Sequence, residues 1–291
     1  MTTSQPLLTA PDVASVRVPE AGLRQDLRAV KVVWQRELIR FLHDRARIVS
    51  SLLQPILFLF VLGSGLESLV SRGGGVSLKT FLFPGVLSMA ILFTAAFSAG
   101  SMVWDREFGF LREMLVAPVR RGAIVAGKCL GGATVATFQG VLMLCLAGLV
   151  HVPYAPALLL TLVIELLLLA FTITAFGVMV AARIRSIQSF MALVQMLLLP
   201  MFFLSGALFP LANLPAWLRA LNLVDPLTYA VDPMRRAVFA RLDLPAAARH
   251  ALTPGVTWAG WRVPTLVELL VVAAIGLLAL TVAILEFRQT E

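Results

Sequence analysis

Long apolar stretches separated by short polar segments dominate the hydropathy pattern of this chain. A helix that crosses a bilayer needs about 20 mostly apolar residues to cover about 30 Å of hydrocarbon. Six stretches meet this requirement, and they run over Ile48–Leu66, Phe81–Trp104, Ile124–Val150, Ala157–Ala181, Ile187–Phe209 and Pro264–Phe287. The pattern predicts an all-α polytopic membrane protein with a six-helix transmembrane domain over residues 48–287.

Composition supports the same fold class. Of the 291 residues, 59% are hydrophobic and only 14% are charged, and the mean hydropathy is +0.90. Soluble domains have about 25% charged residues and about 45–50% apolar residues. These values exclude a soluble enzyme, a disordered tail protein and a disulfide-stapled secreted domain.

The distribution of basic residues predicts the orientation. With a cytosolic N-terminus, sixteen Lys and Arg residues fall inside and eight fall outside, and six of those eight lie in the long loop 210–262. Basic residues in short loops favour the cytosolic side, whereas long loops translocate largely regardless of charge. We therefore expect a multi-pass protein of the cell membrane with both termini in the cytosol, namely a flexible lead-in over residues 1–22 and a tail over residues 288–291.

A segment before the first span has an amphipathic pattern. Apolar residues recur at three- and four-residue steps within residues 23–47, at Leu23, Leu27, Val30, Trp34, Leu38 and Phe41. Basic residues occupy the other surfaces, as in helices that lie in the membrane interface. We expect an interfacial helix here; a soluble bundle helix is the alternative.

The cytosolic loop 105–121 is too polar to span a membrane, yet its apolar residues have helical spacing. These residues are Phe108, Leu111, Met114 and Leu115, and Pro118 disfavours further helix. A short amphipathic helix displayed to the cytosol would dock a partner. An ordinary solvated loop explains the composition equally well.

The external stretch 210–262 is interrupted by prolines, beginning with Pro210, and carries short apolar runs that include Trp217 and Tyr229. These pieces are too short to cross a bilayer. We expect them to form a helical lid on the outer leaflet between the fifth and sixth spans.

Residues 122–129, GAIVAGKC, match the first seven positions of the phosphate-loop pattern. A phosphate loop needs a preceding strand and a hydroxyl ligand for Mg²⁺ in the eighth position. Cys129 occupies that position and a membrane span follows, so we reject a nucleotide site. We expect Lys128 to reach the cytosolic headgroups and Gly127, Gly131 and Gly132 to allow close helix approach.

Few polar groups lie within the spans. Glu165 stands in the middle of the fourth span, where a charge costs about 2.5–3.5 kcal/mol on insertion scales. It is either a substrate or proton contact or a hydrogen-bonded glutamate at a helix interface. The faces that carry Phe93 and Phe97, and Gln195 and Phe202, suit an amphiphile corridor or plain helix packing. The sequence shows no constellation of catalytic or metal-ligating residues.

In this order, the elements resemble the permeases of type 2 ABC exporters, a family of drug and polysaccharide exporters. Two stretches carry the resemblance, Pro84–Arg121 with the second span and the cytosolic loop, and Leu204–Phe239 with the fifth span and the lid.

The resemblance implies a permease homodimer that works with two copies of a separate ATP-binding subunit, which holds ATP and Mg²⁺. The coupling role would fall on Arg106, Glu107, Phe108, Gly109, Arg112, Leu115 and Pro118. It also implies a path lined by Phe93, Phe97, Gln195 and Phe202, and a lid that acts as an outer gate.

Rival functions are a proton-coupled secondary carrier, an ATP-independent lipid scramblase and an intramembrane enzyme. A carrier would favour inverted repeats and a chain of ionisable groups within the membrane, for which Glu165 alone gives little support.

Overall fold

The computed structural model describes residues 22–67, 76–110, 114, 119–212, 214–258 and 260–289. Helices dominate these ranges, and a two-stranded antiparallel ribbon pairs β1 with β2. The elements are α1 (Leu23–His43), α2 (Arg45–Leu57), the π-helix η1 (Phe58–Leu62), α3 (Gly63–Gly65), α5 (Leu78–Ala99), α6 (Ser101–Glu107), α8 (Arg121–Leu144), the 3₁₀ turn η2 (Ala147–Val150), α9 (Pro156–Arg183), α10 (Ile187–Leu204), α11 (Ala216–Val224), α12 (Thr228–Phe239), α13 (Ala246–Leu252), β1 (Thr257–Trp258), β2 (Trp261–Arg262) and α14 (Thr265–Gln289). The predicted lead-in before Gly22 and residues 290–291 of the predicted tail lie outside the described residues.

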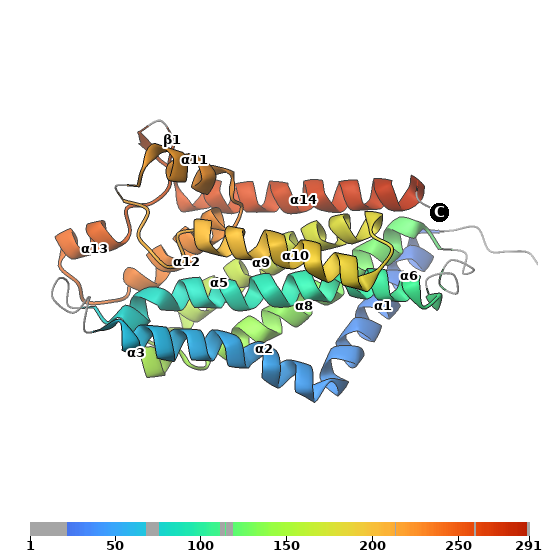
Figure 1. The fold of residues 1–291 in the computed structure, drawn as a ribbon, viewed down its shortest axis with the longest axis horizontal. Coiled ribbons are helices and arrows are strands. Elements are labelled where there is room, and N and C mark those ends of the chain that lie inside the picture. Colours follow the sequence, from blue (N-terminus) through green and yellow to red (C-terminus); the bar gives the residue numbers. More distant parts are fainter. Residues whose placement is uncertain are drawn as a thin grey trace, which may run out of the picture.

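Long helices run side by side along the longest axis of the molecule (Figure 1). Within the described ranges, five helical stretches are long and apolar enough to cross a membrane, and they cover Arg45–Gly65, Leu78–Glu107, Pro156–Arg183, Ile187–Leu204 and Thr265–Phe287. They coincide with five of the six predicted spans. The polytopic all-α class is therefore confirmed.

The third predicted span corresponds to α8, which is not among those five. Its 24 residues give a length of about 36 Å at 1.5 Å per residue, enough for the hydrocarbon core. Lys128 and Gln139 lower its hydropathy, and the helix ends at Leu144 instead of Val150. The third predicted span, Ile124–Val150, therefore stays a prediction.

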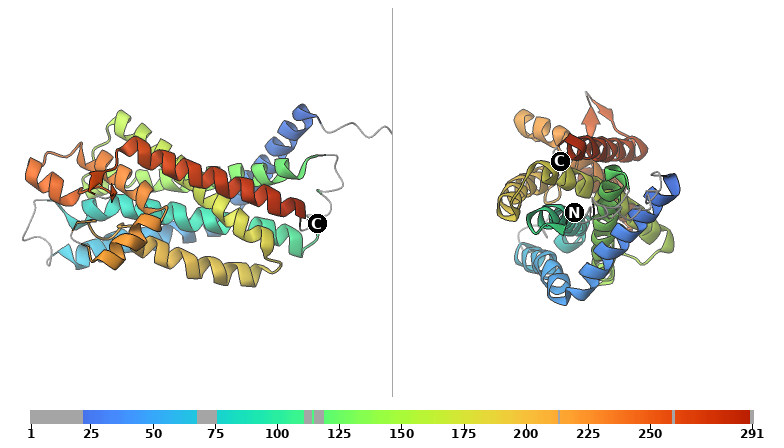
Figure 2. Two further views of the ribbon diagram at one scale, coloured as in Figure 1. Left: turned by 90° about the horizontal axis from the view of Figure 1, so that it is seen from above. Right: turned by 90° about the vertical axis from the view of Figure 1, so that its right-hand side faces the viewer.

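The two ends of the bundle carry different elements (Figures 1 and 2). At one end lie α6, the oblique helix α1 and the C-terminal end of α14; we call this the α6 end. At the other end lie α11, α12, α13 and the β ribbon; we call this the lid end. The start of the predicted cytosolic loop, in α6, and the predicted external lid thus lie at opposite ends of the long helices.

Helix α1 covers Leu23–His43 of the predicted helix 23–47, which is interrupted at Asp44, and it packs on the glycine stripe of α8. A Cβ added at Gly127 would lie 2.8 Å from Cβ of Val33, and one at Gly131 would lie 2.7 Å from Cβ of Glu37. The predicted close approach is confirmed. The side of α1 that becomes buried carries two carboxylates, on Asp26 and Glu37, beside Val33 and Phe41, whereas Leu23 and Leu27 are exposed.

At the lid end, α10 stops at Leu204 and not at the predicted Phe209. Gly206 adopts φ +72°, a left-handed conformation that suits glycine and ends helices. The guanidinium of Arg235 donates to the freed carbonyl oxygens of Gly206 at 2.7 Å and Ala207 at 3.0 Å. It also lies over the Phe81 ring, 4.4 Å from the centroid. A residue assigned to an external loop is therefore almost fully buried.

The lid is thus partly internal. Most of α12 is buried, in contact with α5, α9 and α14. Arg236 of α12 binds Asp232 and, at 2.6 Å, the buried Glu268 of α14. Between α11 and α12, burial raises the pKa of Asp225 to about 7, against the lowering effect of the Leu227 N–H that its carboxylate accepts. The ion pairs attach the lid to the last helix.

The α1–α8 contact yields a prediction. We expect Gly131→Val to lower the free energy of unfolding by about 1–3 kcal/mol, because the added methyl groups overlap Glu37. The check is the apparent unfolding temperature of the purified protein in detergent. Gly65→Val is the matched control, because nothing lies within 4 Å of its added Cβ. Equal unfolding temperatures for the two variants would contradict the close packing.

Candidate functional site

The α6 end is organised around the carboxylate of Asp105. This side chain is fully buried, and its Oδ2 lies 2.6 Å from Nζ of Lys128. Its Oδ1 lies 2.9 Å from Nη2 of Arg36. A buried charge requires such partners, because the loss of hydration costs several kcal/mol per ion. Asp105 therefore attaches α6 to both α1 and α8.

Lys128 completes this group of charges, which we call the ion cluster: Arg36, Glu37, Asp105 and Lys128. The ammonium of Lys128 lies 3.0 Å from Oε1 of Glu37 and 3.1 Å from Oγ of Ser101. The prediction that Lys128 reaches lipid headgroups is wrong, because the glycine stripe brings α1 and its carboxylate within reach. The side chain is 1% exposed, so it is not available to a nucleotide phosphate.

The next two residues of α6 bind the connection between α9 and α10. Nη1 of Arg106 donates to the carbonyl oxygens of Ala181 at 3.2 Å and Ile184 at 2.9 Å. Oε2 of Glu107 accepts the backbone N–H of Ile187 at 2.9 Å, in the first turn of α10. Such a carboxylate is favourable at the positive end of a helix dipole. Arg106 and Glu107, predicted to face a partner, thus also hold the α9–α10 turn.

After Glu107 the chain presents apolar groups outward. The Phe108 side chain is 57% exposed and Phe110 is 48% exposed. Between them Gly109 adopts φ +81°, which favours glycine and ends α6. The guanidinium of Arg36 lies 5.9 Å from the Phe110 ring centroid and donates to Sδ of Met114. The other predicted coupling residues, Arg112, Leu115 and Pro118, lie outside the described residues.

The far end of the predicted loop is also attached to α1. The backbone N–H of Arg120 donates to Oδ1 of Asp26 at 3.1 Å, and its Nε lies 3.4 Å from Oδ2. Residues 105 and 120, at the two ends of the loop, therefore bind the same helix. A force applied to this loop would act directly on α1.

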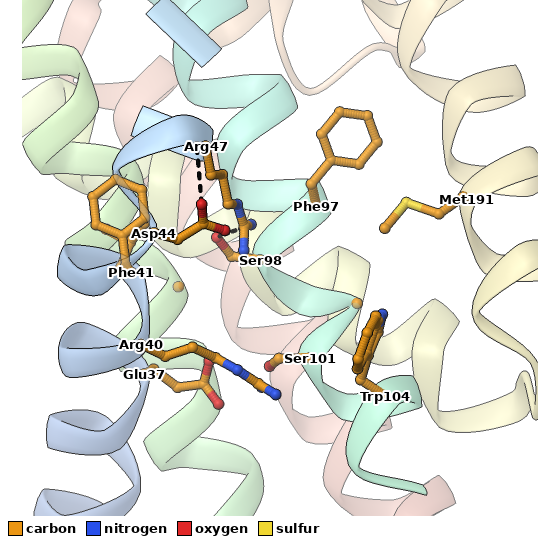
Figure 3. Close-up of a pocket in the computed structure, with 13 residues that line it drawn as sticks. Glu37, Arg40, Phe41, Asp44, Arg47, Phe97, Ser98, Ser101, Trp104 and Met191 are labelled. Atoms are coloured by element: carbon orange, nitrogen blue, oxygen red, sulfur yellow. Dashed lines mark hydrogen bonds between the residues drawn. The ribbon is translucent and has the colours of Figure 1, made fainter. Parts of the chain in front are cut away.

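A cavity of about 470 Å³ lies beside the ion cluster, between the α1–α2 bend, α5, α6 and α10 (Figure 3). Phe97 and Met191 face it from α5 and α10, and Trp104 lines its lower part. Phe93 precedes Phe97 by one turn of α5, with ring centroids 6.0 Å apart, and it lines a smaller adjoining cavity. The structure thus brings two of the four predicted path residues together.

The other two path residues differ in burial. Gln195 is exposed on α10, whereas Phe202 is buried against the Phe58 ring of η1, with centroids 5.8 Å apart. Seven residues fall about 20° short of two turns of an α-helix, so the spacing still places both residues on nearly the same face of α10. They differ because Phe58 of η1 covers Phe202, whereas Gln195 stays exposed.

Glu165 is buried in α9, and its Oε2 has no hydrogen-bond partner among the described residues. Among the predicted lid residues, Trp217 is exposed on α11 and Pro210 is half-buried. Tyr229 is buried and donates to the carbonyl of Leu223 at 2.9 Å. The lid residues therefore do not form one surface.

Sequence reasoning missed the ion cluster. Its signal was present, because Asp105 and Lys128 stand next to apolar spans and Glu37 interrupts an amphipathic helix. Their mutual distances depend on how α1 crosses α8, which no local pattern encodes.

Comparison with known proteins adds an independent observation. The sequence profile of the family described as ABC-2 type transporter matches residues 28–239. Nodulation protein J of Rhizobium leguminosarum bv. viciae is 31% identical over 207 residues, which cover 70% of this chain and 79% of that protein. The inner membrane transport permease YadH of Escherichia coli K12 is 26% identical over 219 residues, which cover 75% and 85%.

The ion cluster yields a prediction. We expect Lys128→Met to lower the free energy of unfolding by about 3–5 kcal/mol, because Glu37 and Asp105 would stay buried without their shared cation. The apparent unfolding temperature and the yield of folded protein report the change. Arg183→Met is the control, since Arg183 is 76% exposed in its pair with Glu286 and such pairs contribute at most about 1 kcal/mol. A loss no larger than that of the control would contradict the role of Lys128.

Proposed function

This chain belongs to the ABC-2 type transporter family, and from that premise we propose that it is an export permease driven by a separate ATP-binding subunit. The transmembrane permease role follows from the family. The export direction, the amphiphilic substrate and the coupling to ATP are the proposal. The substrate class is a drug-like molecule, a lipid or a glycan.

The observation that carries the proposal is that anchored residues at the end of α6 are followed directly by exposed aromatic residues. Phe108 and Phe110 offer apolar side chains outward at the α6 end. Exposed aromatic side chains on a short segment are typical anchors for a protein partner. We assign this end to the cytosol, where an ATP-binding subunit would meet Phe108, Phe110 and the rest of the loop 105–121.

Three consecutive side chains would then transmit the movement of that subunit. Asp105 binds α1 and α8, Arg106 binds the end of α9, and Glu107 binds the first turn of α10. Closure of the ATP-binding subunits would displace the loop 105–121 and, with it, the helices α1, α8, α9 and α10. Alternating access of this kind converts a change at one end into a rearrangement of packed helices.

A second copy of this chain would complete the path. The apolar outer faces of α2, η1 and α10 are open, with Val49 66%, Val61 67% and Met196 68% exposed. In the proposed homodimer, some of this surface faces the second copy and the rest faces lipid. The cavity beside Phe93 and Phe97 would open toward the shared axis, with the lid from Pro210 as the outer gate.

One observation favours a different class. Glu165 is buried in α9 with an oxygen that lacks a partner within the described part of the chain, as a proton-carrying group in a secondary carrier would be. Transport that persists without the ATP-binding subunit and collapses with an uncoupler would establish that class. Lipid equilibration without ATP in liposomes would instead establish a scramblase.

Two variants separate docking from transmission. We expect Phe108→Asp to weaken binding of the ATP-binding subunit by about tenfold or more, because it places a charge in an apolar contact. We expect Glu107→Arg to retain the subunit and its ATP hydrolysis but to lose transport, because the contact with the Ile187 N–H is replaced by repulsion.

The measurements are copurification, ATP hydrolysis and dye uptake into inverted vesicles that contain both subunits. Arg185→Gln, at an exposed arginine of the α9–α10 turn, is the control. Normal coupled transport in the Glu107→Arg variant would refute transmission through Glu107, and normal copurification of the Phe108→Asp variant would refute docking at Phe108.

A further inference from the structure

The cavity beside the ion cluster has one polar wall and one apolar wall (Figure 3). We call it the elbow cavity, because it lies inside the bend between α1 and α2. Arg40 and Arg47 reach it from this bend, and Ser98 and Ser101 face it from α5 and α6. Phe97, Trp104 and Met191 form the apolar side.

The Arg47 guanidinium has much unused hydrogen-bonding capacity in this cavity. A guanidinium carries five N–H donors. Among the described residues, the only hydrogen bond of this guanidinium is to Oγ of Ser98, at a long 3.5 Å. The nearby carboxylate of Asp44 accepts the backbone N–H of Arg47 at 3.0 Å and so caps α2. The Arg47 side chain is therefore free to bind a ligand.

Two arginines and two carboxylates line the cavity, Arg40, Arg47, Glu37 and Asp44. Both carboxylates have other partners, because Glu37 pairs with Lys128 at 3.0 Å and Asp44 caps α2. Asp105 binds Lys128 at 2.6 Å and Arg36 at 2.9 Å, but Arg40 only at 3.8 Å. Among the described residues, Arg40 and Arg47 thus have no carboxylate within hydrogen-bonding distance of their guanidinium groups. Guanidinium groups in this state attract an anion.

The opposite wall suits an apolar group. Trp104 is 44% exposed, and Phe97 and Met191 are partly buried. Aromatic and methionine side chains accommodate varied apolar shapes. At about 470 Å³ the space falls within the range of small-molecule sites. One end of a ligand would thus meet guanidinium groups while its body meets rings and a thioether.

We propose that the elbow cavity binds an anionic amphiphile, with its carboxylate, phosphate or sulfate head on Arg47 and Arg40 and its apolar body against Phe97, Trp104 and Met191. One part of this inference rests on the proposed function, namely that the bound ligand is the exported substrate. Guanidinium groups bind such heads through paired, charge-assisted hydrogen bonds. The headgroup of an anionic lipid and a free organic anion share this chemistry.

The test uses the purified full-length permease in phosphatidylcholine nanodiscs, without an ATP-binding subunit. The probe is ω-bromoundecanoate, whose bromine quenches a tryptophan that it contacts; ω-bromoundecanol is the uncharged match. The signal of Trp104 is obtained by subtraction of the Trp104→Phe variant. We expect saturable quenching by the carboxylate, and about tenfold weaker binding in Arg47→Gln, since hydrogen bonds to charged groups contribute about 1.5–3 kcal/mol.

Control variants and the uncharged probe separate the effect of the Arg47 charge from a general effect on folding. Arg47→Lys keeps the charge and is expected to recover part of the affinity, while Arg185→Gln, outside the cavity, is expected to leave it unchanged. Binding of the alcohol is expected to be weaker and insensitive to Arg47→Gln. Equal quenching by the acid and the alcohol, or unchanged affinity in a folded Arg47→Gln variant, would overturn the proposal.

Competition identifies the source of the anion. Displacement of the probe by phosphatidylglycerol in the nanodisc supports a lipid headgroup, whereas displacement by inorganic phosphate supports a free anion. Because no ATP-binding subunit is present, the outcome is independent of the proposed function. A permease that binds the probe but fails to export with that subunit would overturn the export role alone.

Discussion

The buried charge of Asp105 is the constraint on which the α6 end depends. Its carboxylate is removed from water, so it requires Lys128 from α8 and Arg36 from α1 at hydrogen-bonding distance. Loss of one partner of a buried pair costs about 3–5 kcal/mol. This cost favours the observed crossing of α1 over α8. The glycine residues of α8 permit α1 to approach closely, and the ion cluster favours one alignment of α1 along α8.

This constraint has a mechanical consequence, because Asp105 begins the loop that we propose binds the ATP-binding subunit. Arg106 and Glu107 follow it directly and bind the α9–α10 turn, and Arg120 returns the loop to Asp26 of α1. The loop is thus attached at both ends and along its first turn. The elbow cavity lies against the same anchors, so a displacement of α6 would change its shape and the positions of Arg40 and Arg47.

The sequence predicted the features that depend on local pattern. Long apolar runs located the helices, the amphipathic period located α1, and the small residues at Gly127 and Gly131 identified the face of α8 that another helix approaches. It did not predict the pairing of Lys128 with Glu37 and Asp105, because that pairing depends on the crossing of helices distant in sequence. It also placed Arg235 in an external loop, although the carbonyl groups freed at Gly206 bind it inside the protein. Burial there depends on tertiary contacts that hydropathy does not register.

The central claim is that α6 and the first turn of α10 move as one body. Spin labels at Trp104→Cys of α6 and Gln188→Cys of α10, in a Cys129→Ala and Cys145→Ala background diluted with unlabelled copies, would report the distance between them by pulsed electron resonance. The account predicts one narrow distance that is the same with and without ATP on the partner subunit, and a broadened distance after Glu107→Gln. A distance that changes when ATP binds to the complex with Glu107 intact would contradict it.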